Sequence, residues 1–144
     1  ELLPGLMVHQ DGIFGLSCTW SHRHAAYVSG LGTFGLSEGL ITKRGKAVRF
    51  TTLILEAPLD VAQRPYKNHH EWCLYFQDGS CGICMSRCPI QAITESGHDK
   101  NACADYEEVF ATKYWPKNLD RGDYILGCGL CQAGIPCQNE NPTK

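Results

Sequence analysis

Residues 78–89 read DGSCGICMSRCP, and this stretch decides how the chain is interpreted. Cys81, Cys84 and Cys88 follow the spacing C-x2-C-x3-C-P, which matches the last three cysteines of the bacterial run that binds 4Fe-4S clusters. In that run the last cysteine ligates a second cluster. Asp78 stands where the run has its first cysteine, so one ligand has to come from another part of the chain.

Eight of the nine cysteines can be divided between two cubes. Cys73 lies a few residues upstream of the run, across the short turn at 78–80, and can fold back to the vacant corner. We assign the first cluster to Cys73, Cys81, Cys84 and Cys137, and the second cluster to Cys88, Cys103, Cys128 and Cys131. Each C-x2-C pair then lies on a different cube. Asp78 as an oxygen ligand remains an alternative, although a carboxylate is harder than the ligands that these iron sites usually take.

Two other chemistries use the same residue types. A zinc ribbon needs four ligands in two pairs, which gives no role to Pro89 or to the remaining cysteines. A disulfide scaffold is typical of small secreted domains, but such frameworks rarely repeat C-x2-C pairs. The spacing therefore favours iron-sulfur binding over both. We interpret Cys18, which lies outside the pattern, as a small buried hydrophobe.

Length and charge narrow the class of protein. With 144 residues the chain forms one domain, or one small domain and part of another. Its net charge of −2 gives no basic footprint for nucleic acid, and no apolar run reaches the length of a membrane span. Thiolate-bound clusters persist in reducing surroundings, so we expect a cytoplasmic, anaerobic setting. Because the chain begins at Glu1 instead of Met, we also expect a piece of a longer protein.

Local signals predict four secondary-structure elements. Ser21 is a good N-cap for a short helix through residues 24–28, which Gly30 would end. Residues 47–55 are rich in β-branched and apolar side chains and predict a strand. A helical turn started by proline is expected over 89–93, and a longer helix over 104–114.

Residues 30–35 read GLGTFG and match the dinucleotide-binding pattern G-x-G-x-x-G. That fingerprint follows a strand and opens a helix, whereas this loop follows a helix and leads through Gly39 to a strand. Three glycines in six residues instead indicate that the backbone approaches something closely. The neighbour is either a large flat ligand or a packed part of the protein.

The stretch HAAYVSGLGTFG at 24–35, with LIT at 40–42 and VRF at 48–50, resembles epoxyqueuosine reductases and reductive dehalogenases. In those families this segment lies just ahead of a ferredoxin module. The order of the cysteines is similar too, including the lone Cys103 between the two groups. The resemblance implies an α+β fold in which a bacterial two-cluster ferredoxin-like module is joined to part of a nitroreductase-like corrinoid-binding domain.

This resemblance implies a division near Pro65, where the composition changes. Residues 1–64 would be part of the corrinoid domain, and residues 65–144 the ferredoxin-like domain with two 4Fe-4S clusters. The residues expected to contact a cobalamin-type corrinoid are Gly30, Gly32, Thr33, Phe34, Gly35 and Arg49. Arg49 could hold an anionic group such as a corrinoid phosphate, or form an ion pair with a local carboxylate.

Two classes of function stay open. The chain is either an oxidoreductase, or the core of one, that passes electrons to a corrinoid-dependent reduction, or a ferredoxin-type carrier that docks to a partner reductase. Residues 15–21 contain no Asp or Glu, where epoxyqueuosine reductases place an acidic proton donor, so no catalytic residue is assigned. We interpret His24 as a surface or capping histidine, and His69 and His70 as loop residues or hydrogen-bond donors beside the cluster ligands.

Overall fold

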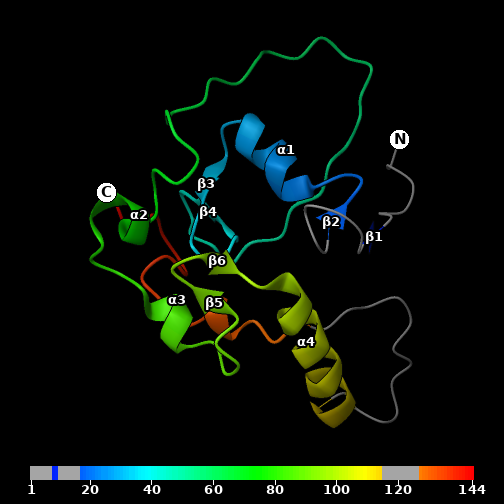
Figure 1. The fold of residues 1–144 in the computed structure, drawn as a ribbon. Helices are drawn as coiled ribbons and strands as arrows, with labels where there is room; N and C mark the ends of the chain where they lie inside the picture. Colours follow the sequence, from blue (N-terminus) through cyan, green and yellow to red (C-terminus); the bar gives the residue numbers. More distant parts are fainter. Residues whose placement is uncertain (1–7, 10–16, 115–126) are drawn as a thin grey trace.

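The computed structural model describes residues 8–9, 17–114 and 127–144. Short helices alternate with three two-stranded antiparallel sheets, an α+β arrangement as predicted (Figure 1). In chain order the elements are β1 (Val8–His9), β2 (Ser17–Cys18), α1 (His22–Val28), β3 (Gly32–Phe34), β4 (Leu40–Thr42), α2 (Leu74–Asp78), α3 (Ile83–Ser86), β5 (Ile93–Thr94), β6 (Gly97–His98), α4 (Lys100–Tyr114) and the 3-10 helix η1 (Leu130–Gln132). Within the described ranges, no helix combines the length and apolar character that crossing a bilayer requires.

Helix α1 begins and ends where its sequence signals predict. Ser21 is the N-cap, and its hydroxyl oxygen accepts a hydrogen bond from the His24 backbone N–H at 3.3 Å. At the other end, Gly30 adopts a positive φ of 80° and donates its N–H to the Tyr27 carbonyl oxygen at 3.0 Å. The chain then turns directly into strand β3.

The β3–β4 hairpin is the most buried element of the described chain. Thr33 pairs with Ile41 in the antiparallel register, and both side chains are fully buried. A Cβ atom on Gly32 would lie 2.2 Å from the Ile41 carbonyl oxygen, so only glycine allows the two strands to approach this closely. Ile41 and Leu40 thus form the centre of the fold.

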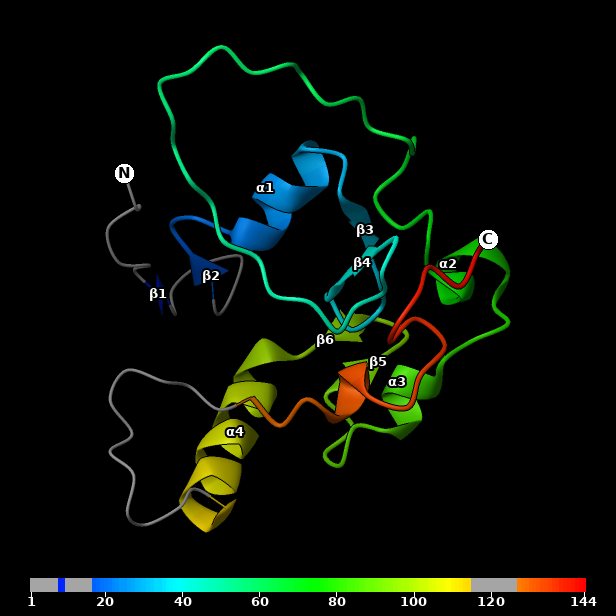
Figure 2. The ribbon, with the colours of Figure 1, turned by 180° about the vertical axis from the view of Figure 1, so that it is seen from behind.

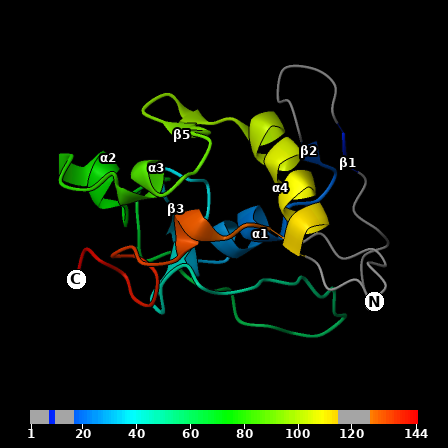
Figure 3. The same ribbon diagram turned by 90° about the horizontal axis from the view of Figure 1, so that it is seen from below.

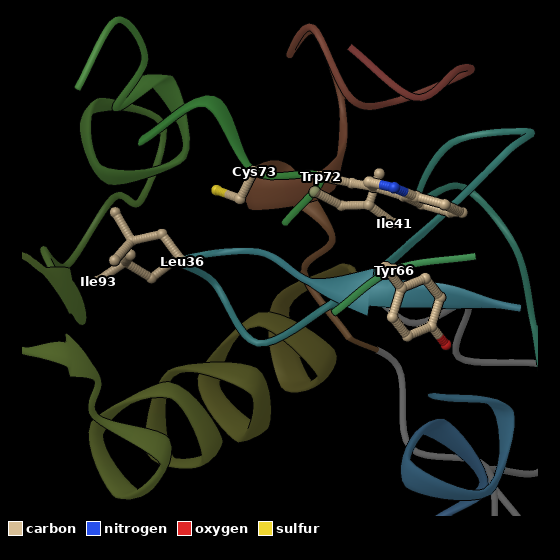
Figure 4. Packing of buried hydrophobic residues seen from close by; sticks show 6 residues of the cluster. All are labelled: Leu36, Ile41, Tyr66, Trp72, Cys73 and Ile93. Atoms are coloured by element: carbon tan, nitrogen blue, oxygen red, sulfur yellow. The ribbon is translucent and has the colours of Figure 1, made fainter. Parts of the chain in front are cut away.

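Segments from both halves of the chain pack on this hairpin. The buried cluster combines Leu36 and Ile41 with Tyr66, Trp72, Cys73 and Ile93 (Figure 4). Residues 66–73 lie along β3, because the Trp72 N–H donates to the Thr33 hydroxyl oxygen at 2.9 Å and the Phe34 N–H donates to the His69 carbonyl oxygen at 2.8 Å. The segment that leads to Cys73 is therefore fixed by the hairpin.

The C-terminal segment meets the same hairpin from its other end. The backbone N–H groups of Lys46 and Ala47 donate to the Gln138 carbonyl oxygen at 3.0 and 2.9 Å. From behind, this segment runs beside the hairpin (Figure 2). In the view from below, the orange η1 lies between α3 and α4 (Figure 3), and it contacts α3. These contacts bring the two C-x2-C pairs to one side of the hairpin.

Three element predictions need comment. The strand predicted over 47–55 is wrong, because this segment forms only an isolated β-bridge at Leu53, and its Leu53, Ile54 and Leu55 side chains are exposed in a wide arc (Figure 1). The helical turn predicted over 89–93 is also wrong: Gln91 has a positive φ of 54°, and Ile93 enters β5 instead. The helix predicted over 104–114 is confirmed as α4, which begins four residues earlier, at Lys100.

Candidate iron-sulfur centre

Each cysteine of the predicted ligand set lies on a defined local element. Cys73 is the N-cap residue of α2, Cys84 lies within α3, and Cys88 directly follows Arg87, the C-cap residue of α3. Cys103 lies in the first part of α4, and Cys131 lies in η1. The remaining members come just before or after these elements: Cys81, Cys128 and Cys137.

One group of thiols gathers around Cys137. Burial raises the pKa of the Cys137 thiol, while the charge of Lys46 acts in the opposite direction. Three further thiols, those of Cys73, Cys84 and Cys81, add to the rise in pKa. Burial likewise raises the pKa of Cys84, and Cys73 and Cys81 are again among its charged neighbours. These four thiols are therefore close enough to influence one another's ionisation.

A second group gathers around Cys103. Burial is the main reason that the pKa of Cys103 is raised to about 11, and the Glu107 carboxylate contributes next. The thiols of Cys131, Cys128 and Cys88 also raise it. Burial raises the pKa of Cys131, whose thiol neighbours are Cys128 and Cys88. The two groups of four are the same as in the sequence-based ligand assignment, which stays a prediction.

Arg87 and two backbone features hold the second group in place. The Arg87 Nε–H donates to the Leu130 carbonyl oxygen at 3.0 Å, which joins α3 to η1. Gly134, with a φ of 65°, allows the Arg87 guanidinium to lie against the loop, since a Cβ there would be 3.1 Å from Nη1. The Ala92 N–H points at the Cys88 sulfur, 3.2 Å away. A backbone N–H aimed at a ligand sulfur is one of the features that set cluster potentials.

The donor set fits iron-sulfur clusters. Soft thiolates are the usual ligands of such clusters, and both groups offer thiols alone. Among the residues with described positions, no three His, Cys, Asp or Glu side chains converge closely enough to hold a single metal ion. A 4Fe-4S cluster is larger than a single metal ion and holds its four thiolates farther apart. Thiols that are close together without converging on one point therefore fit such a cluster.

Asp78, the alternative ligand, is engaged locally. Its Oδ1 accepts a hydrogen bond from the Ser80 N–H at 2.9 Å, and its side chain is fully exposed. Hydrogen bonds from the Ser80 side chain and then from its backbone lower the pKa of this carboxyl. The carboxylate thus closes the turn between α2 and Cys81.

The expected corrinoid contacts are divided between two environments. Protein atoms surround the three glycines of the loop: a Cβ on Gly30 would be 2.8 Å from the Gln63 carbonyl oxygen, and one on Gly35 would be 3.2 Å from Ile41 Cδ1. Thr33 and Phe34 are buried beside them. The close approach inferred from the glycines is therefore, in this structure, an approach to packed protein. Contact of the loop with a corrinoid stays a prediction.

Arg49 is the one exposed member of that set. It lines a cleft of about 310 Å³ together with Trp20, Arg23, Lys46, Phe50 and Gln132, among others. Arg23 is held by donating from Nη1 to the Glu38 carbonyl oxygen at 2.7 Å. The cleft thus gathers three cationic residues next to Cys131, the neighbour of Gln132 in sequence.

Three predictions about single residues can be compared with the structure. Cys18 is not buried, in contrast to the prediction: it lines the cleft, is half-exposed, and its thiol donates to the Trp20 carbonyl oxygen at 3.2 Å. His24 is a capping histidine, with Nδ1 2.8 Å from the Ser21 hydroxyl oxygen. His69 and His70 are loop residues: His69 stacks on Phe34 at a ring distance of 4.5 Å, and His70 Nδ1 lies 2.9 Å from the Phe34 carbonyl oxygen.

Sequence reasoning missed Lys46, whose side chain is 3% exposed and acts electrostatically on three of the thiols. It lies in the polar run KRGK at 43–46, where Lys43 and Arg44 are exposed. Nothing in the run distinguishes the buried lysine from its neighbours. Only the fold of the hairpin does.

Comparison with known proteins first defines the class. Residues 78–137 match the family described as 4Fe-4S double cluster binding domain, so the chain is an iron-sulfur protein of the 4Fe-4S kind.

The similar proteins of known identity are epoxyqueuosine reductases. The chain is 30% identical over 111 residues to an epoxyqueuosine reductase of Leadbetterella byssophila, a match that covers 75% of this chain and 34% of the relative. It is 31% identical over 122 residues to an epoxyqueuosine reductase of Aliivibrio fischeri, covering 82% of this chain and 30% of the relative. The predicted resemblance to epoxyqueuosine reductases is confirmed, and the chain spans about a third of their length. No solved structure matches it significantly.

Proposed function

We propose that the chain binds two 4Fe-4S clusters and passes electrons from a donor protein to a corrinoid-dependent reduction. The observation that carries this proposal is the gathering of eight thiols into two neighbouring groups of four. Cys131 of the second group helps to raise the pKa of Cys84 of the first group, so the two cofactors would lie near each other. When bound, such clusters accept and release single electrons.

The ligands proposed for the first cluster are Cys73, Cys81, Cys84 and Cys137, and those for the second are Cys88, Cys103, Cys128 and Cys131. The protein supplies the rest of the environment. The β3–β4 hairpin fixes Cys73 through the Trp72 N–H bond to Thr33, and the Arg87 bond to Leu130 fixes α3 against η1. Burial of the thiols favours a low-dielectric surrounding that excludes water from the clusters.

We propose that the electron acceptor binds at the cleft that Arg49 lines. The exposed cationic residues Arg23 and Arg49 in its lining suit an acceptor with an anionic group, such as the phosphate of a corrinoid. Trp20 and Phe50 add flat apolar surface to the same walls. Residues 1–64 would then be one part of a corrinoid-binding domain, with further parts supplied by chain that the longer relatives possess.

Cluster content is tested by reconstituting the protein without oxygen and measuring iron, acid-labile sulfide and zinc. Two cubes require about eight iron and eight sulfide per chain. One zinc without sulfide would contradict the proposal entirely. About four iron would mean that the spacing Cys131-x5-Cys137 or the replacement of the first cysteine by Asp78 has removed one site.

Corrinoid binding is tested by titrating cobalamin into the anaerobic protein and following the cobalt absorption bands. Arg49→Ala should weaken binding, whereas Arg44→Ala, which changes an exposed arginine outside the cleft lining, should not. Gly32→Val is unsuitable as a binding test, because its side chain would collide with the Ile41 backbone and disrupt the hairpin. If neither this chain nor a longer natural protein that contains it binds cobalamin, the function is that of an electron carrier that docks to a partner reductase.

A further inference from the structure

Lys46 is a buried cation in the turn that follows β4. Its side chain is 3% exposed, and its Nζ donates a hydrogen bond to the Ser37 hydroxyl oxygen. Two glycines make room for it. A Cβ on Gly39 would lie 2.4 Å from Lys46 Cε, and one on Gly35 would lie 3.3 Å from Nζ. The β3–β4 turn is therefore shaped around this lysine.

No carboxylate compensates the charge of Lys46 among the described residues. Glu38, at the tip of the same hairpin, pairs with Lys100 at 3.2 Å and lies 3.9 Å from His98. An ammonium group removed from water is costly unless negative charge lies nearby. The fold keeps this lysine buried, so something else must supply that charge.

Thiols of both proposed ligand groups lie within electrostatic reach of Lys46, and as cluster-bound thiolates they would supply negative charge. Cys84 and Cys137 belong to the first group and Cys131 to the second, and each interacts with Lys46. For each of these thiols Lys46 is the largest single charge effect, acting against the effect of burial. The geometry agrees, because the Lys46 backbone N–H donates to the Cys137 carbonyl oxygen at 2.8 Å and Lys46 lines the same cleft as Gln132, the neighbour of Cys131 in sequence. One cation thus lies near both proposed cluster sites.

We infer that Lys46 is a counter-cation shared by the two clusters and that its positive charge raises the reduction potential of both. A cube held by four thiolates carries net negative charge, and it gains one more negative charge when it accepts an electron. A fixed positive charge nearby stabilises the reduced form more than the oxidised form. Burial strengthens this effect because water does not screen it. The inference rests on the two-cluster binding proposed above.

The test compares Lys46→Met with Lys46→Arg and with Lys43→Met. Iron and sulfide are measured first in each reconstituted protein. Each protein is then reduced with dithionite at a series of set potentials under argon, and the reduced clusters are counted by electron paramagnetic resonance. At a given potential, Lys46→Met should show at least about a tenfold lower ratio of reduced to oxidised cluster, which is about 59 mV for one electron. Lys46→Arg should stay near the wild type, and so should Lys43→Met, which removes an exposed charge from the same turn.

Unchanged midpoints in a fully loaded Lys46→Met protein would overturn the inference, and so would an equal shift in Lys43→Met, since that would indicate a general effect of net charge. If Lys46→Met does not load clusters, Lys46→Gln, which is also neutral but polar, takes its place. If both neutral variants lose their clusters while Lys46→Arg keeps them, the inference that Lys46 sets the reduction potential is overturned, and the role of Lys46 is purely structural. If the wild type itself lacks two clusters, the proposed function fails; if it holds both and Lys46→Met is unshifted, only this inference fails.

Discussion

The backbone N–H of Lys46 donates a 2.8 Å hydrogen bond to the carbonyl oxygen of Cys137. This bond joins the turn after β4 to the last cysteine of the chain, which is 91 residues further along. The same turn carries the buried lysine side chain. The position of Cys137 therefore depends on the hairpin as much as on its own short loop.

Replacing Gly45, the residue before Lys46, should release that contact. Gly45 has a φ of 82°, and a Cβ on it would lie 2.3 Å from the Gln138 carbonyl oxygen. We expect Gly45→Ala to destabilise the protein by roughly 2–4 kcal/mol and to remove about four iron per chain, since Cys137 moves. Chemical denaturation and iron analysis of the anaerobic protein provide the two measurements.

Gly79→Ala is the matched control for this substitution. Gly79 also has a positive φ, of 74°, but a Cβ there would meet nothing within 4 Å. It should therefore cost only the left-handed backbone penalty of about 1–2 kcal/mol and keep its iron. Equal losses in the two variants would show that backbone strain, and not the contact with Gln138, accounts for the effect.

Cys73 supplies the most unusual ligand of the proposed set, so its removal is diagnostic. Its thiol is buried and is a charged neighbour of Cys84 and Cys137. Cys73→Ala should lose or degrade the first cluster, leaving about four iron per chain. Iron and sulfide analysis, together with electron paramagnetic resonance of the reduced protein, will show whether one type of cluster remains.

Two substitutions serve as controls for Cys73. Asp78→Ala removes a carboxylate that closes a turn with Ser80, and Cys18→Ser changes a thiol that donates to Trp20. Both should keep the full iron content. Loss of a cluster from Asp78→Ala alone would mean that an oxygen ligand occupies the corner that we assign to Cys73.

Local signals predicted those parts of the fold that depend on neighbours in sequence. Ser21 caps α1, and the spacing of Cys81, Cys84 and Cys88 is matched by the family of residues 78–137. The strand predicted over 47–55 failed because β-branched residues favour a strand without ensuring a continuous ladder, and only Leu53 of this segment forms a β-bridge. Propensity could not show that Leu53 would lie in an exposed arc.

Burial of Lys46 was unpredictable for a related reason. It depends on Ser37 and on the space left by Gly35 and Gly39, all of which come from the hairpin turn that precedes β4. The three glycines of 30–35 did indicate a close approach, but sequence alone could not decide between a flat ligand and the neighbouring backbone. The structure fills those positions with Gln63 and Ile41 atoms.

The buried hydroxyl of Thr33 should prove important for the segment that carries Cys73. Thr33 is 0% exposed, and its oxygen accepts the Trp72 N–H at 2.9 Å. Thr33→Val keeps the shape but leaves that N–H without its partner, which should cost about 1–3 kcal/mol. Thr94→Val is the control, because Thr94 is exposed and its oxygen accepts a longer bond, 3.2 Å, from the Ser96 N–H. Denaturation midpoints that fall equally in both variants would contradict the role given to Thr33.

The stacking of the exposed His69 ring on the buried Phe34 ring should make stability depend on pH. Burial lowers the pKa of His69 from its ordinary value of 6.5, and the charges of His70 and His24 lower it further, while Glu38 opposes them. The pKa values of His24 and His98 are lowered too, in both cases mainly by burial. The unfolded chain therefore takes up protons first as the pH falls. Stability is fully present above about pH 6.5 and is lost as the pH falls below it, through the lowered folded-state pKa values.

His69→Phe tests this dependence, because phenylalanine can keep the stacking on Phe34, where the rings are 4.5 Å apart, but cannot take up a proton. Melting midpoints of the anaerobic protein are compared at about pH 7.5 and about pH 5.5. The wild type should lose stability between these values, and His69→Phe should lose less. Both proteins carry the same clusters, so any loss of stability caused by acid damage to the clusters is equal in the two and cancels in the comparison. An identical loss in both would mean that the titration of His69 does not contribute.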